Sequence, residues 1–265
     1  IAPVTVVARV DAGAAGVLAA TGSMARRGVA TESRGFWGGI AFNMSGARRR
    51  SKAGGVGRYI PGTMFPYRDD NPSILTPVVT VALIAANLAV WVVVQGLGAP
   101  ERLAASVCEL GLVPGDLMGR LPVGFAFPVA DGIACVVEPG RPWRTLLTSM
   151  FLHGGWLHLL GNCWFLWIFG NNVEDAMGHR RFLLFYLVAG VVAALTQVAV
   201  GPGSAVPMVG ASGAISGVMG AYVILYPQVR VHTVVPLLII FFRLTVAAWL
   251  MLGLWFVMQV VNAQF

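Results

Sequence analysis

Ser212 is the residue whose setting in this sequence best suits nucleophilic chemistry. It stands in the run Gly210-Ala211-Ser212-Gly213 and opens an apolar segment of 15 residues that ends before Pro227. As a helix, that segment would be ~22 Å long, which is too short to cross a bilayer alone. If the helix ends at a membrane surface near Pro227, Ser212 lies at hydrocarbon depth. Non-helical backbone at that depth must be shielded or hydrated, so the sequence predicts a wet cavity at Ser212.

Two polar residues upstream have the spacing of oxyanion donors. His158 and Asn162 are four residues apart, so their side chains share one face of a helix. Both side chains donate hydrogen bonds, and the Ser212 N–H at a helix N-terminus is a third donor that the helix dipole strengthens. A serine that attacks a carbonyl needs such donors, and it also needs a base. The sequence therefore predicts an oxyanion hole made by His158, Asn162 and the backbone of Ser212.

Simple helix packing also explains part of this pattern. Gly213, Gly217 and Ala221 repeat every four residues, which is typical of a small-residue face in a tightly packed membrane helix. The nucleophile elbow of the α/β-hydrolases is a worse explanation, because it needs Gly-x-Ser-x-Gly after a strand and Ala214 stands at the required glycine. The four-residue run alone therefore leaves packing and catalysis open.

A metal centre is not expected. His153 and His158 would need a third ligand, and Cys163 lies on another face of the helix from His158. The sequence therefore predicts neither a metal nor another cofactor.

The composition indicates a membrane protein. With 57% hydrophobic and 11% charged residues, the chain has too little polar surface for an ordinary soluble domain. We expect an all-α, polytopic bundle of about five helices. A solute transporter would also have short broken helices, but the sequence lacks the repeated halves expected of one. The expected spans are 74–95, 156–170, 182–200, 212–226 and 244–261, with an interfacial apolar stretch at 234–242.

Charge predicts the orientation. Residues 1–73 carry ten Lys and Arg against four Asp and Glu, whereas the rest of the chain carries eight against seven. The basic tail lacks interleaved aromatic residues, so no nucleic-acid partner is expected. Residues 1–63 are expected to be disordered or a non-native extension. By the positive-inside rule this tail and the loops with Arg180, Arg181 and Arg230 are cytoplasmic, so Ser212 and the loop 96–141 face outward.

Two cysteines lie in that outward loop. Cys108 and Cys135 would form a disulfide if the loop faces an oxidising compartment. Two reduced thiols fit the sequence equally well, so both states remain open.

Three runs follow one another along the chain: Pro142–Asn162, with Trp143-Arg144 and His153-x4-His158-x3-Asn162; Gly170–Gly178; and Gly210–Gly217. Together they resemble the rhomboid family of intramembrane serine proteases, most closely its bacterial members. The resemblance covers residues 64–265 and implies a six-helix core in a bacterial plasma membrane, with transmembrane proteins as substrates. It implies that Ser212, between Gly210 and Gly213, is the nucleophile, and that His158 and Asn162 bind the oxyanion. His153 would support His158, and Trp143-Arg144 would set the first loop partly into the membrane.

The same resemblance implies a base histidine on a sixth span, and the printed sequence contains none. His179 and His232 are expected in cytoplasmic loops. Without that sixth span, we expect the face of Gly213, Gly217 and Ala221 to lack the helix against which it would pack. Two hypotheses follow: a truncated or frameshifted record of a protease, or an inactive rhomboid-like protein that binds transmembrane helices of clients without cutting them. In both cases the chain as printed is expected to be inactive.

Overall fold

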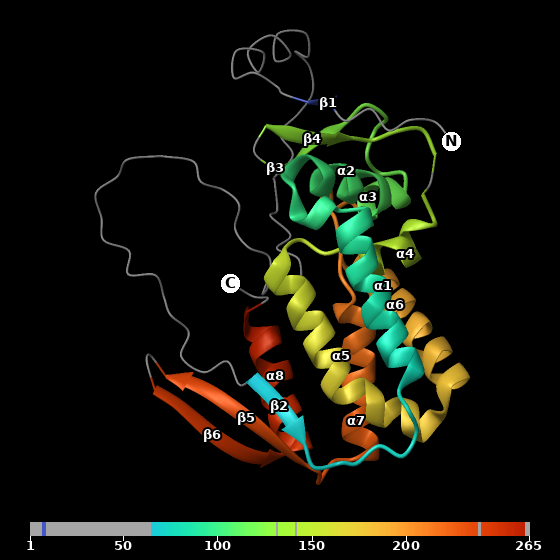
Figure 1. Cartoon of the computed structure of the whole chain (residues 1–265). Helices are drawn as coiled ribbons and strands as arrows, with labels where there is room; N and C mark the ends of the chain where they lie inside the picture. Colours follow the sequence, from blue (N-terminus) through green and yellow to red (C-terminus); the bar gives the residue numbers. More distant parts are fainter. Residues whose placement is uncertain (1–6, 9–64, 131, 141, 238–239, 263–265) are drawn as a thin grey trace.

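The computed structural model describes residues 7–8, 65–130, 132–140, 142–237 and 240–262 (Figure 1). The prediction of disorder for residues 1–63 therefore falls outside the described residues, except at Val7 and Ala8. The described part is mostly helical, as expected. Its helices are α1 (Val78–Val93), α2 (Pro100–Leu110), α3 (Pro114–Leu117), α4 (Thr145–Thr148), α5 (Trp156–Met177), α6 (His179–Val200), α7 (Ser212–Leu225) and α8 (Ala248–Asn262), with short 3-10 turns at Gly96–Gly98 and Ser149–Phe151.

Helix α7 is central to the bundle. It packs against both α5 and α6, and α1 lies against α5 (Figure 1). Buried side chains of α5, α6, α7 and α8 form the main apolar core. The helix that begins at Ser212 is 14 residues long, so the predicted short helix is confirmed.

The small-residue face of α7 does have a packing partner, contrary to the sequence prediction. A Cβ on Gly213 would lie 2.6 Å from the Cβ of Ala193, and a Cβ on Gly217 would lie 2.6 Å from that of Ala189. Both alanines belong to α6. The prediction was wrong because a four-residue repeat identifies a packing face without identifying the helix that covers it.

The number of membrane spans stays a prediction. Among the described helices, α6 alone is both long and apolar enough to cross a bilayer by itself. Helix α5 also has 22 residues, but it runs past the predicted end at Gly170 into a polar turn that contains Glu174 and Asp175. Helices α1 and α7 are apolar and shorter.

Two small sheets correct the expectation of an all-α fold. Strands β1 (Val7–Ala8), β4 (Ile133–Val136) and β3 (Ala126–Ala130) form one, and β2 (Phe65–Asp69), β5 (Arg230–Leu237) and β6 (Ile240–Ala247) form the other, each in that order. The stretch 234–242, expected as an interfacial apolar segment, belongs to the β5–β6 hairpin. The helix expected from Leu244 begins only at Ala248. Its first four residues pair with β5 instead, and this cross-strand pairing has no signal in local hydropathy.

The long outer loop is folded and crosslinked. Cys108 of α2 and Cys135 of β4 form a disulfide, which decides between the two states that the sequence left open. Both cysteines pack in a small apolar cluster with Val113, Phe127 and Val137. The disulfide joins the two halves of this loop, so the loop is a compact cap on one end of the bundle.

An acidic pair at the end of α5 holds the start of α1. The Glu174 carboxylate accepts hydrogen bonds from the N–H groups of Val79 and Thr80, both at 2.8 Å. Asp175 accepts from the N–H groups of Ile74 at 3.1 Å and Leu75 at 2.7 Å. The Glu174 bonds satisfy two N–H groups that the first turn of α1 leaves free, whereas Asp175 holds the segment just before the helix.

Replacing Gly217 by alanine should destabilise the α6–α7 contact. The new Cβ would meet Ala189 at 2.6 Å, and overpacking of this kind costs about 1–3 kcal/mol. The higher helix propensity of alanine would offset at most about 1 kcal/mol of this loss of stability. We expect a lower midpoint of thermal unfolding for the detergent-solubilised variant. Gly220→Ala is the matched control, because a Cβ there meets nothing within 4 Å. A Gly217→Ala protein as stable as this control would contradict the packing.

Candidate active site

Ser212 begins α7 directly after a sharp turn. Gly210 has φ +122°, a backbone conformation that favours glycine, and its N–H donates to the Ser149 carbonyl at 2.9 Å. Upstream of this turn, Leu112 and Met208 exchange two backbone hydrogen bonds, which tie the loop to the outer cap. The turn and Ala211 are buried, whereas Ser212 is partly accessible. The fold therefore places the serine hydroxyl at the edge of the bundle interior.

His158 lies against this turn. A Cβ on Gly210 would come within 2.7 Å of both Cε1 and Nε2 of the His158 ring, and within 3.8 Å of the Ser212 Oγ. The glycine thus lets the imidazole edge approach the backbone next to the serine. His158 Nδ1 accepts a hydrogen bond from the Gly154 N–H at 3.3 Å. This bond favours the neutral tautomer with its proton on Nε2, so the atom near Gly210 is a donor.

Asn162 lies one turn further along α5 and is buried. Its Nδ2 donates to the carbonyl of His158 at 2.8 Å, within the same helix. Among the hydrogen bonds of the described residues, none joins His158 or Asn162 to Ser212. The structure therefore brings His158 and Ser212 together, whereas the Asn162 amide is engaged with its own helix.

His153 packs behind His158. The two rings meet edge to face with centroids 5.2 Å apart, and the His153 side chain is fully buried. Neither of its ring nitrogens has a partner among the described residues. Burial lowers the pKa of His153 to about 3, and the neighbouring His158 adds to this effect, so the ring is neutral at physiological pH.

Gln95 is a positioning residue that the sequence analysis missed. Its amide Oε1 accepts from the His153 N–H at 2.8 Å, and its Nε2 donates to the His153 carbonyl at 2.8 Å. Gln95 follows Asn87 and Trp91 at four-residue spacing, and all three side chains are buried. In the sequence, the polar residues Asn87 and Gln95 share one helix face with Trp91 in an otherwise apolar run. That pattern could have identified Gln95 as a buried polar residue.

Trp143 and Arg144 lie apart from this cluster, just before α4. The Trp143 side chain is 54% exposed. Arg144 has its Nη2 4.0 Å from Glu109 Oε1, and both side chains are exposed. No hydrogen bond of the described residues links this pair to Ser212, and a contact with lipid remains a prediction for them.

The other two histidines lie at the opposite end of the bundle, but they are not in loops as predicted. His179 is the first residue of α6, with its Nδ1 2.5 Å from Glu174 Oε1. His232 lies in β5, with its Nε2 2.9 Å from Asp70 Oδ1. The hydrogen bond with His232 is the main cause of the lowered pKa of Asp70. Since the sequence has four histidines, only His153 and His158 lie on the Ser212 side.

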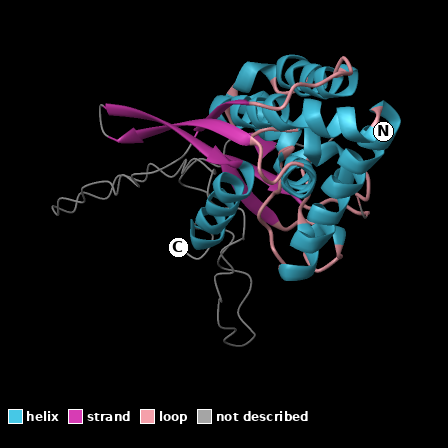
Figure 2. Cartoon of the chain, turned by 90° about the horizontal axis from the view of Figure 1, so that it is seen from below, coloured by secondary structure: helices cyan, strands magenta, loops and turns pink. Residues whose placement is uncertain are grey.

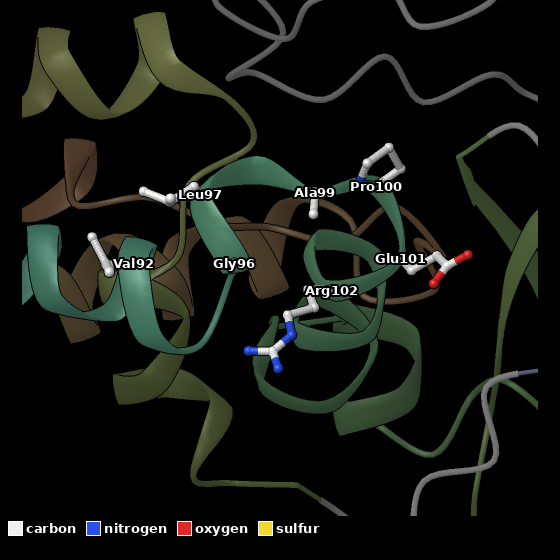
Figure 3. Close-up of a pocket in the computed structure, with 7 residues that line it drawn as sticks. All are labelled: Val92, Gly96, Leu97, Ala99, Pro100, Glu101 and Arg102. Atoms are coloured by element: carbon white, nitrogen blue, oxygen red, sulfur yellow. The ribbon is translucent and has the colours of Figure 1, made fainter.

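A hollow on the surface lies away from the serine. Figure 3 shows it between the end of α1 and the start of α2. Arg102 reaches back from α2 and donates from Nη1 to the Val93 carbonyl at 3.3 Å, so it caps the end of α1. Within the described ranges, no three His, Cys, Asp or Glu side chains are grouped to hold a metal ion.

Comparison with known proteins finds a family match that covers all three sequence runs described above. Residues 139–264 match the family model of the Rhomboid domain. The chain is 44% identical over 86 residues to "Rhomboid protease GluP" of Bacillus subtilis, covering 32% of this chain and 16% of that protein. It is 43% identical over 82 residues to "Rhomboid-like protein 11, chloroplastic" of Arabidopsis thaliana, covering 31% and 29%. It is 33% identical over 87 residues to "Presenilin-associated rhomboid-like protein, mitochondrial" of Homo sapiens, covering 32% and 23%.

The matches thus span less than a third of each of these relatives. Their names place them in a bacterium, a chloroplast and a mitochondrion, so the bacterial type is not confirmed. No significant match to a solved structure was found.

Replacing Gly210 by alanine should displace His158. The new Cβ would overlap the ring at 2.7 Å, in a backbone conformation that alanine rarely adopts. We expect a lower unfolding midpoint and a changed His158 signal in histidine-selective 15N NMR. Gly203→Ala, in the same loop, meets nothing within 4 Å and should change neither. Identical His158 signals in the two variants would refute the contact.

Proposed function

The chain belongs to the rhomboid family through its Rhomboid domain at residues 139–264, and we propose that it is an intramembrane serine endopeptidase that cleaves transmembrane segments of membrane proteins. Rhomboid family proteins are integral membrane proteins. The observation that supports the proposal most is that the His158 ring and the Ser212 Oγ both lie beside Gly210. A Cβ added to this glycine would be 2.7 Å from the ring and 3.8 Å from the Oγ. This arrangement combines a hydroxyl, a helix N-terminus and an imidazole donor at one point.

In this proposal Ser212 attacks the carbonyl of a substrate peptide bond. The oxyanion that forms would accept hydrogen bonds from the Ser212 N–H, which belongs to the first turn of α7, and from His158 Nε2–H. Asn162 would contribute its amide after releasing the His158 carbonyl, or by its second N–H. His153 and Gln95 would act through His158, because they hold the backbone and the ring behind it.

The base is assigned to none of the four histidines. His179 and His232 hydrogen-bond Glu174 and Asp70 at the far end, and His158 is needed as a donor. The second candidate function is that of an inactive rhomboid-like protein that binds transmembrane helices of clients. The two functions differ in whether Ser212 ever becomes acylated.

We also propose that the Ser212 end faces outward from a bacterial plasma membrane and that the N-terminus is cytoplasmic. The Cys108–Cys135 disulfide in the cap beside Ser212 suits an oxidising compartment. The arginines at 180, 181 and 230 lie at the other end, as the positive-inside rule requires for the cytoplasmic side.

The printed chain should not react at Ser212. Removing the base from a serine protease costs roughly 10³-fold or more, so a fluorophosphonate probe should label the 265-residue protein no more than Ser212→Ala. Labelling that Ser212→Ala abolishes would mean that another group accepts the proton. Cleavage itself is tested on the protein as its gene encodes it, including any codons after Phe265, with a transmembrane reporter. Ser212-dependent cleavage supports the protease, whereas co-purification of uncut reporter without cleavage supports the inactive binder.

In a form that cleaves, replacing His158 or Asn162 by alanine should lower kcat by about 10²-fold, as expected for loss of one oxyanion donor. His232→Gln is the control, because it lies in β5 far from Ser212 and should leave kcat unchanged. The rates are compared at equal protein concentration with the same reporter. Unchanged kcat in both site variants would remove His158 and Asn162 from the proposed roles.

A further inference from the structure

The β5–β6 hairpin extends sideways from the bundle beyond the helices that it connects (Figures 1 and 2). Residues directly opposite in an antiparallel pair point to the same face, so the register assigns its side chains to two faces. Thr233 is paired with Leu244, and Val231 with Val246, on one face. Arg230 and His232, and their partners Ala247 and Thr245, lie on the other, together with Arg243.

The first face is apolar and only partly covered. Val231 and Thr233 are fully buried, and Val231 belongs to the main core of the bundle. On β6, however, Phe242 is 46% exposed and Leu244 is 45% exposed on this same face. Trp249, near the start of α8, is also 50% exposed. The bundle therefore leaves an apolar strip, made by Phe242 and Leu244, along β6.

The second face belongs to a strongly basic end of the molecule. Arg180, Arg181, Arg230 and Arg243 are exposed, and among the described residues no carboxylate lies within 4.0 Å of them. The acidic groups at this end already have partners. These are Asp69 with Tyr222 and Asn172, Asp70 with His232 and Arg68, Glu174 with Thr80 and His179, and Asp175 with the N–H groups of Ile74 and Leu75.

We propose that this hairpin lies flat in the membrane interface and binds the anionic phospholipids of the cytoplasmic leaflet. Phe242 and Leu244 enter the boundary between headgroups and acyl chains, and Arg230 and Arg243 contact lipid phosphates. Charge complementarity selects this occupant, because unpaired arginines beside an exposed apolar strip match an anionic leaflet. The inference rests on the proposed membrane orientation, and it does not depend on catalysis.

A second copy of the chain is the competing occupant. Strand β6 is at the edge of its sheet, and an open edge pairs readily with another strand. Arg243 argues against such pairing, since two copies joined along β6 would bring their arginines together. A charged residue in an edge strand is a common device against edge-to-edge association.

Spin labels on the two faces provide the test. Phe242→Cys and Thr245→Cys would be labelled with a nitroxide in full-length Cys163→Ser protein with the disulfide kept oxidised. The protein is reconstituted in vesicles of phosphatidylcholine, with or without phosphatidylglycerol. Electron paramagnetic resonance then compares accessibility to oxygen and to a water-soluble nickel chelate. A label at Val192→Cys, on the exposed side of α6, serves as the reference for lipid.

We expect the oxygen-to-nickel accessibility ratio to be severalfold higher at 242 than at 245. Phosphatidylglycerol should raise the ratio at 242, and Arg230→Gln combined with Arg243→Gln should remove that increase. Equal, water-like ratios at 242 and 245, with a lipid-like ratio at 192, would overturn the interface proposal alone. A water-like ratio at 192 as well would show that α6 is not in lipid, and it would overturn the proposed membrane insertion together with the interface proposal. Dipolar broadening between labels at 245 would show that a second copy occupies the edge, and a phosphatidylglycerol effect that survives both arginine changes would refute anionic lipid binding.

Discussion

The close approach of α7 to α6 is the constraint on which the rest of the structure depends. Gly213 and Gly217 face Ala193 and Ala189 so closely that the helices can meet only if these two positions of α7 lack a Cβ. Close backbone approach lets dispersion contacts hold two helices together where lipid removes most of the hydrophobic driving force. Because Gly213 follows Ser212 directly, the packing that joins the helices also sets the position of the serine.

The candidate site is built by segments that are distant in the chain. The cap holds the approach to Ser212 through the Leu112–Met208 bridge and the Gly210 bond to Ser149, and α5 supplies His158. Gln95, two residues after the end of α1, fixes the backbone of His153 with two hydrogen bonds. The hydrogen bonds among these contacts pair polar groups in a mostly buried region, so losing one leaves an unpaired donor or acceptor.

The two ends of the bundle differ in chemistry. The end near Ser212 is covered by a folded loop with a disulfide, and the other end has a network of carboxylates that fixes β2 and the start of α1. Burial raises the pKa of Asp69, and the hydrogen bond from Tyr222 opposes that effect. These carboxylates are engaged in the network, and within the part of the chain that the structure describes none of them pairs with Arg180, Arg181, Arg230 or Arg243.

The sequence by itself determined the features that depend on local spacing. The beginning of a short helix at Ser212 and the shared face of His158 and Asn162 follow from residues a few positions apart, and α5, α6 and α7 were expected close to where they occur. Only the tertiary structure decided the partner of the glycine face, the pairing of β5 with β2 and β6, the disulfide, and the role of Gln95. These join residues tens of positions apart or more, or depend on a strand register, and hydropathy reports the environment of a residue without identifying the residue that it meets.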